Sequence, residues 1–350
     1  MGFFTFKTNG GFITARNLTN LINQAGYVVV LAIGMTIILI LKHIDLSVGY
    51  VAGFCGAAAA ILMTRYQINE WAAILLVLVL GLAIGLYQGI LVTKVGVPAF
   101  VTTLAGMFIF RGLLNLFLQE SGTIIVPNAG FNALSNGFIP DLPFDTGIHL
   151  LTLLIGAAAV IIMIFSQLKS RKNKQQYNFP VISSPIFIFK LIFLSIIIML
   201  VIYVLAKYSG LPWTAVIVGV VLLGYNYVLT KTRLGRYIYG IGGNEQAAEL
   251  SGINVKRVTL FAFCSMSVLA ALAGVLYTSR LQSATPTAGL GFEMDAIASS
   301  YIGGVAVSGG VGRVTTTIIG ALVIMSLTNG MNLMGVENSN IYGVKGLFLI

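Results

Sequence analysis

Apolar runs long enough to cross a membrane recur along the whole chain. A membrane-spanning helix needs about 20 apolar residues, because each adds about 1.5 Å and the hydrocarbon layer is about 30 Å thick. Such runs occupy residues 21–41, 46–63, 71–92, 97–118, 148–168, 186–206, 211–229, 258–279, 296–308 and 314–334, and a further run begins near 343. The pattern predicts an all-α fold, a polytopic transmembrane helix bundle of about 8–11 spans.

The chain reads as a single transmembrane domain over residues 1–350. It contains neither a long Pro- or Ser-rich linker nor a low-complexity tail. Residues 1–20 resemble the end of a preceding span and its loop, and the chain stops within an apolar run. We therefore expect that it is trimmed at both ends.

Two of the runs are unusually rich in Gly, Ala and Ser. They cover residues 46–63 and 296–312, and each follows an acid, Asp45 or Asp295. Small residues let helices approach closely in lipid, so one interpretation places both runs at the centre of the bundle. The other makes them broken or re-entrant segments whose backbone lines a cavity. Their shared position after an acid suggests a weak internal repeat.

Composition excludes an ordinary soluble domain, and charge orients the spans. The chain is 57% hydrophobic and 9% charged, whereas soluble domains contain about 25% charged residues. The net charge of +10 comes from Lys and Arg clustered in short loops, which sets topology and does not indicate nucleic-acid binding. The basic segments 169–174 and 230–257 should therefore be cytoplasmic. The loop 119–147 has acids but neither Lys nor Arg, and should lie outside.

Catalytic and cofactor signatures are missing from the sequence. It has no phosphate-binding G-x-x-x-x-G-K-[ST] motif, and its two histidines, His43 and His149, are isolated from each other and from paired carboxylates. Both cysteines, Cys55 and Cys264, lie inside apolar runs. We expect no enzyme activity, no metal and no cofactor in this chain.

One polar segment interrupts this apolar sequence. Residues 235–257 read GRYIYGIGGNEQAAELSGINVKR, with strong helix formers from Glu245 to Leu250. Asn244 is suited to cap a helix start and Gly252 to end it. This pattern predicts a short helix along the cytoplasmic face, within segment 230–257. It is either a solvated loop helix whose charge only sets topology, or a docking helix for a soluble partner.

The same segment resembles the cytoplasmic coupling segment of permeases from sugar-importing ABC transporters of the ribose, galactose and xylose type. Three further blocks resemble that family in the same order along the chain. They read AIGMTIILILKHIDLSVGYVAGF, GVPAFVTTLAGMFIFRGL and LQSATPTAGLGFEMDAIASSYIGGVAVSGGVG. The extra length around KSRKNKQQYNF is most similar to the permeases for xylose and for multiple monosaccharides.

The resemblance implies a multi-pass protein of the bacterial inner membrane that imports a monosaccharide. It implies two permease copies, a soluble subunit that holds ATP and Mg²⁺ on the cytoplasmic face, and a sugar-binding protein outside. By match to the motif, the contact with the ATP-binding subunit is expected at Gly243, Asn244, Glu245, Ala247, Ala248, Ser251 and Gly252.

Several polar residues near the spans have more than one possible role. Asp45, at the inner edge of its span, and Ser47 are expected to cap the following helix. Arg111 either faces the pathway or extends to the outer interface. Glu293 and Asp295, on the outer side, either cap a helix or meet the binding protein. Candidates for sugar contact or helix–helix hydrogen bonds are Gln88, Asn115 and Asn329.

An ion-coupled secondary transporter is the alternative. It would favour acids buried within the membrane as ion sites. All acids of this chain are expected at span edges or in loops, which counts against it.

Overall fold

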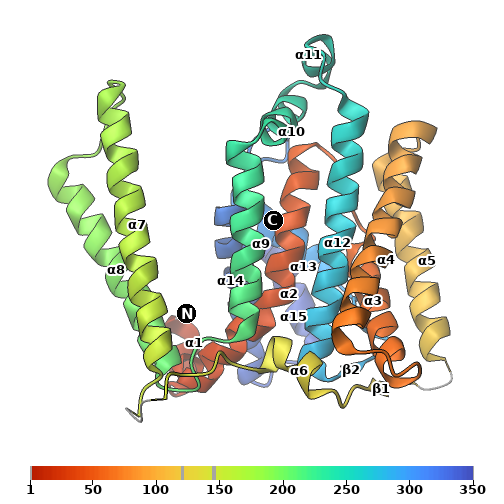
Figure 1. Ribbon diagram of the computed structural model, residues 1–350, viewed down its shortest axis with the longest axis horizontal. Coiled ribbons are helices and arrows are strands. Elements are labelled where there is room, and N and C mark those ends of the chain that lie inside the picture. The colour runs from red at the N-terminus through yellow and green to blue at the C-terminus, as the bar shows by residue number, and fades with distance from the viewer. Residues whose placement is uncertain (1, 120–121, 144–146, 350) are drawn as a thin grey trace. The chain divides into compact units, whose positions relative to one another are not determined.

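The computed structural model describes residues 2–119, 122–143 and 147–349 and is almost wholly helical (Figure 1). Glu120 and Asp145, two of the acids in the predicted outer loop, lie outside these residues. Among the described residues, eight helices are long and apolar enough to cross a membrane. They are α2 (Ala15–Ile40), α4 (Glu70–Ile90) with its π-helical extension η2 (Leu91–Val95), α5 (Ala99–Leu118), α7 (Leu150–Gln176), α8 (Ser184–Ala206), α9 (Trp213–Lys231), α12 (Val255–Leu281) and α14 (Val314–Leu333).

Shorter elements fill the remainder. They are α1 (Gly2–Lys7), η1 (Gly11–Ile13), α3 (Val48–Thr64), α6 (Ala129–Asn136), α10 (Arg233–Gly243), α11 (Glu245–Leu250), α13 (Phe292–Ile302), α15 (Asn338–Leu349) and the paired strands β1 (Ile124–Ile125) and β2 (Ser283–Ala284). The predicted all-α bundle and its span count are confirmed.

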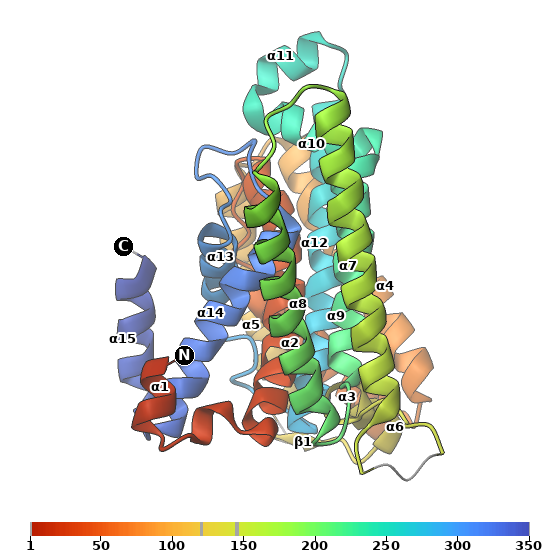
Figure 2. The same ribbon diagram turned by 90° about the vertical axis from the view of Figure 1, so that its left-hand side faces the viewer.

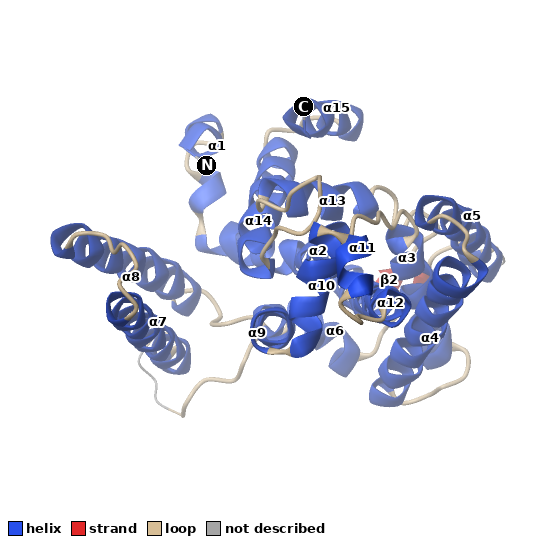
Figure 3. Ribbon diagram, turned by 90° about the horizontal axis from the view of Figure 1, so that it is seen from above, coloured by secondary structure: helices blue, strands red, loops and turns tan. Residues whose placement is uncertain are grey.

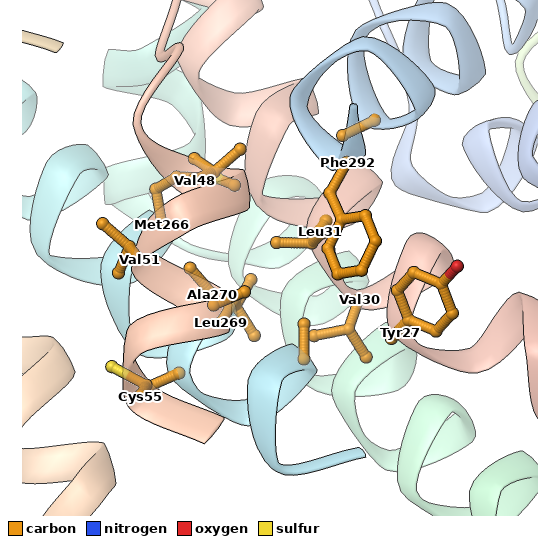
Figure 4. Packing of buried hydrophobic residues seen from close by; sticks show 14 of the residues in the cluster. Tyr27, Val30, Leu31, Val48, Val51, Cys55, Met266, Leu269, Ala270 and Phe292 are labelled. Atoms are coloured by element: carbon orange, nitrogen blue, oxygen red, sulfur yellow. The ribbon is translucent and has the colours of Figure 1, made fainter. Parts of the chain in front are cut away.

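The chain divides into two compact units. The first comprises Met1–Phe12, Asn20–Gly137 and Trp213–Ile350, and the second Ile13–Thr19 and Phe138–Pro212. In the first unit, α12 packs against α3 and α4, and α13 packs against α14. Small residues allow these close approaches, because a Cβ on Gly274 of α12 would run into the Ala52 carbonyl of α3. Figure 4 shows part of the resulting apolar core.

Helix α3 begins deep inside the first unit. Gly274 contacts Ala52, and Thr278 contacts Gly56, so α3 and α12 run parallel. Val48, the first residue of α3, therefore lies level with the middle of α12. Figure 1 shows α3 in the half of the bundle remote from α11.

Helix α13 also begins inside the unit. The chain between α12 and α13 turns back along α3, where Ala288 meets Gly53 and Gly289 meets Gly49. Helix α13 then has only 11 residues, about 16 Å at 1.5 Å each, which is too short to span a membrane. The Gly-rich residues 296–312 thus form most of a short helix and then a loop, as the broken-segment interpretation proposed.

The second unit is a helical hairpin of α7 and α8. Gly156 of α7 packs against Ile202 of α8, and the Ile139 N–H donates to Leu211 O at 3.0 Å where the chain enters and leaves. The basic residues 169–174 were predicted as a loop but continue α7, because Lys, Arg and Gln are good helix formers and basic residues are favourable near a helix C-terminus.

Asp141 holds the start of α7 in this hairpin. Its carboxylate accepts from the backbone N–H groups of Leu142, Leu150 and Leu151 at 2.8–2.9 Å. Desolvation acts to raise the pKa of Asp141, but these hydrogen bonds and nearby His149 outweigh it and hold the pKa below its usual value.

Candidate coupling and pathway sites

The predicted cytoplasmic helix exists as α11, with the predicted ends. The Asn244 side chain accepts from the Ala247 N–H at 3.0 Å, which caps α11. Gly252 has a φ of +81°, a left-handed conformation that favours glycine and ends the helix. Figures 2 and 3 show α10 and α11 together at one end of the first unit.

Most of the residues predicted to contact an ATP-binding subunit are exposed. Leu250 is 90% exposed, more than any other large hydrophobic side chain in the described part of the chain. The exposed members of the predicted set are Gly243, Asn244, Glu245, Ala247, Ser251 and Gly252. Ala248 differs, because it is only 5% exposed and faces the first unit. It anchors α11 to the bundle and does not present its side chain outward.

The end of α10 is tied to two connections of the first unit. A Cβ on Gly242 would run into the Ile40 carbonyl at the end of α2 and approach Gly310 at 2.7 Å, and the Gly310 N–H donates to that same carbonyl at 2.9 Å. Tyr239 of α10 donates its hydroxyl to Gly312 O at 2.7 Å. The connection 41–47 leads into α3, and the connection 303–313 follows α13. The Lys42 amine donates to Gly243 O at 3.4 Å, so the end of α10, which leads into α11, contacts both connections.

Three of the predicted polar residues come together at the start of α3. One Asp45 oxygen, Oδ1, accepts from the Ser47 N–H at 2.9 Å and from its hydroxyl at 2.7 Å. The Gln88 amide of α4 donates to Ser47 Oγ at 2.9 Å. All three are buried, with at most 1% exposed. Thr103 of α5, which the sequence reasoning missed, donates to Ile44 O beside them at 3.3 Å.

The expected roles of Asp45 and Ser47 need correction. Asp45 lies inside the first unit and not at the edge of a span. The connection 41–47 runs from the end of α2 into the bundle before α3 begins. Ser47 occupies the N-cap position, but its side chain accepts no hydrogen bond from the α3 backbone. Asp45 bonds the Ser47 N–H, so the pair forms a local turn at the start of α3.

Glu293 and Asp295 are buried in the first turn of α13, 8% and 9% exposed. Asp295 forms an ion pair with Lys345 of α15, at 2.7 and 3.0 Å. The N-cap residue of α13 is Gly291 and not either acid, and both acids are buried because residues 285–291 turn inward. Contact of the two acids with a binding protein stays a prediction. The premise that the acids of this chain avoid the interior is also wrong.

The remaining candidates lie apart from this cluster. The Arg111 guanidinium lies over the Tyr50 ring, 5.6 Å from its centre, and Arg111 is exposed. Asn115 is exposed on the same helix, α5. Asn329 is buried on α14 and donates to Gln24 Oε1 at 3.5 Å.

A second polar cluster was not predicted. Thr36 of α2 and Thr317 of α14 share a hydrogen bond of 2.8 Å, and Ser300 of α13 donates to the Ala32 carbonyl at 3.2 Å. All three hydroxyl residues are buried. Single hydroxyls within apolar runs give little signal in sequence. Their use as hydrogen bonds between helices becomes visible only once the helices are paired.

Comparisons with known proteins place the chain in a transport family. A family model described as "Branched-chain amino acid transport system / permease component" matches residues 17–350. The xylose transport system permease protein XylH of Escherichia coli K12 is 37% identical over 350 residues, all of this chain and 87% of that protein. XylH of Haemophilus influenzae is 36% identical over 351 residues, 100% of this chain and 91% of that protein.

A ribose relative is also similar. The ribose import permease protein RbsC of Escherichia coli K12 is 33% identical over 339 residues, 97% of this chain and 85% of that protein. No solved structure matches the chain significantly. Both the family match and the relatives cover nearly every described helix. The chain therefore belongs to the family of branched-chain amino acid transport system permease components and is a multi-pass membrane permease.

Proposed function

We propose that this chain is the membrane-spanning subunit of an ATP-driven, binding-protein-dependent importer of a monosaccharide, xylose or a related pentose or hexose. The observation that carries the proposal is its similarity over the full chain to permeases named for xylose and ribose. The chain moves the sugar without changing it covalently.

Energy enters through α11 in this proposal. A soluble partner that binds ATP and Mg²⁺ docks on the exposed residues of α11. Leu250 supplies apolar contact, and the exposed acids Glu245 and Glu249 supply charge. Exposed ion pairs contribute only about 0–1 kcal/mol each, so apolar burial carries most of the affinity. A second copy of the permease and an external sugar-binding protein complete the assembly.

The ion-coupled alternative gains one supporting observation. Asp45, Glu293 and Asp295 are buried, and buried acids are typical of ion-coupled transporters. Full-length similarity to permeases of named sugar transport systems outweighs this, because it extends over α11 and the membrane-spanning helices alike.

Reconstituted vesicles test the proposal. The permease is co-purified with its ATP-binding subunit, and the sugar-binding protein is added outside. We expect uptake of labelled D-xylose or D-ribose that requires ATP and the binding protein. Uptake that needs no ATP and follows a proton or Na⁺ gradient would establish the alternative.

A further inference from the structure

The connected end of the α7–α8 hairpin carries a cluster of positive charges. Figure 2 shows the two helices side by side, joined at this end by the connection 177–183. The cations of this end are Lys169, Arg171, Lys172 and Lys174 on α7 and Lys190 on α8. Residues 146–244 contain no Asp or Glu, so no acid of either helix or of their connection balances this charge.

The Arg171 side chain is held in a defined orientation. It donates to the Ser184 hydroxyl at 2.8 Å, and its guanidinium lies over the ring of the buried Phe187, 4.5 Å from the ring centre. A guanidinium has five N–H donors in a planar fork and binds phosphate oxygens in pairs. Arg171 uses one donor on Ser184 and is thereby preorganised to bind an anion with the others.

A cavity of about 100 Å³ opens beside Arg171. Two further cations line it, Lys174 and Lys190, and both are exposed. Ser170 adds a hydroxyl to the lining, Val181 and Ile182 add apolar walls, and among the described residues no acid lines it. The cavity thus combines three positive charges with apolar surface, which suits an anion that has an apolar part.

The depth of the cavity matches that of lipid phosphates. Residues 150–168 of α7 carry no charge and cover about 28 Å at 1.5 Å each, close to the thickness of the hydrocarbon layer. The basic residues that follow therefore begin at headgroup level, and their charge places them on the cytoplasmic side. Next to the cavity, Ile186 and Phe189 are exposed on α8, where acyl chains can cover them.

The use of basic residues as a topology signal does not account for this arrangement. A topology signal needs only net charge in a segment such as 169–174. It requires neither a cavity, nor a guanidinium fixed on Phe187, nor a lysine in the second turn of the apolar helix α8. Lys190 brings its charge to the same cavity from the other helix, as a long side chain does when it extends toward the interface.

We propose that this cavity binds the phosphate of an anionic phospholipid of the cytoplasmic leaflet. Arg171, Lys174 and Lys190 hold the phosphate, and the acyl chains lie along the exposed side of α8. Basic pockets between helices on the cytoplasmic side of membranes recognise lipid headgroups through the same chemistry. The lipid supplies the negative charge that the hairpin lacks and fixes its connected end at the membrane surface. The site is independent of the transported solute.

Lipid binding to the intact, detergent-solubilised permease tests the proposal. Native mass spectrometry across a lipid titration gives the affinity for phosphatidylglycerol, which is anionic, and for phosphatidylcholine with the same acyl chains. The cavity variant is Lys174→Gln with Lys190→Gln. The matched control, Lys169→Gln with Lys172→Gln, also removes two exposed charges, but from residues that do not line the cavity.

The wild type should bind phosphatidylglycerol about 10-fold or more tightly than phosphatidylcholine, because charge-assisted hydrogen bonds hold its phosphate without a neighbouring cation of its own. The cavity variant should lose most of this preference. The control should lose severalfold less, since its charges attract the lipid only through the surface potential. Arg171→Lys, which keeps the charge but removes the planar fork, should weaken phosphatidylglycerol binding severalfold. Soluble glycerol phosphate at the same ionic strength should not displace the lipid, because it lacks acyl chains.

Three results would overturn the proposal. One is equal affinity of the wild type for the two lipids. Another is an equal loss in the cavity and control variants, which would leave the basic cluster as a topology signal. The third is displacement of the lipid by glycerol phosphate, which would indicate a site for a soluble phosphate instead. All three are read without sugar uptake, so they are distinct from a failure of the proposed function.

Discussion

The interior ion pair of the first unit shows how one side chain depends on another far away in sequence. Lys345 and Asp295 are 50 residues apart, and their side chains are only 14% and 12% exposed. Removing one partner of a buried pair leaves the other charge unpaired, which costs about 3–5 kcal/mol, although replacing both partners is far less harmful.

We expect Lys345→Met to lower the stability of the permease by about 3–5 kcal/mol, because Asp295 is then buried without its partner. The double variant Lys345→Met with Asp295→Asn should recover most of this loss. Thermal unfolding of the purified protein measures both. Equal stabilities of the single variant and the wild type would show that the pair contributes nothing.

Residue roles were the least predictable part of the molecule. The caps Asn244 and Gly252 follow from local chemistry and are confirmed. The burial of Glu293 does not follow from local chemistry, because it depends on where the preceding loop turns. Hydropathy places a residue near a span end but says nothing about its depth when a helix starts inside the bundle. Asp295 and its partner Lys345 meet only through tertiary packing.

At the scale of elements, span positions were largely predictable, since a bilayer imposes both length and apolar composition. The exceptions are the two Gly-rich segments. Their composition predicted close packing or a break, and the structure has both, with α3 packed on α12 and α13 cut short. Composition alone cannot distinguish close packing from a broken helix, because small residues occur in both. The positions of the neighbouring helices decide between them.

Helix α11 gives the element-scale prediction. We expect Leu250→Ser to weaken binding of the ATP-binding subunit about 10-fold or more, because it removes the most exposed apolar side chain of that helix, and burying a leucine contributes about 1.5–3 kcal/mol. Co-purification with the detergent-solubilised permease, and a titration of the two proteins, measure the affinity for the ATP-binding subunit.

Leu290→Ser is the matched control. Leu290 is also exposed, at 52%, but lies in the loop before α13 and away from α11. That variant should bind the ATP-binding subunit as the wild type does. Equal binding by both variants would remove Leu250 from the docking surface.

At the scale of the whole molecule, the end of α10, which leads into α11, is linked to the end of α2 and to the connection 303–313 through backbone contacts. The Ile40 carbonyl accepts from Gly310 and is covered by Gly242, so the connections before α3 and after α13 are held at one point. Packed backbones of this kind shift as units and transmit displacement well.

Gly242→Ala tests this link. Its new Cβ would meet backbone atoms of Ile40 and Gly310, whereas the Cβ of Gly240→Ala meets only Ile253 Cδ1, at 3.9 Å. We expect Gly242→Ala to keep the ATP-binding subunit and its ATP hydrolysis but to lower sugar uptake per ATP severalfold. Overpacking of this kind costs about 1–3 kcal/mol. Gly240→Ala should be unaffected, and identical coupling ratios in the two variants would contradict the link.

The hairpin of α7 and α8 leaves and rejoins the chain at a single place. Phe138 is bridged to Pro212, and the Trp213 N–H donates to Gly137 O at 3.2 Å. Residues 139–211 are therefore a removable cassette whose two junctions already touch. A gene in which a short turn replaces them keeps α6 and α9 joined at their present spacing. Evolution can therefore lengthen, exchange or discard this insert without changing how α6 packs against α9.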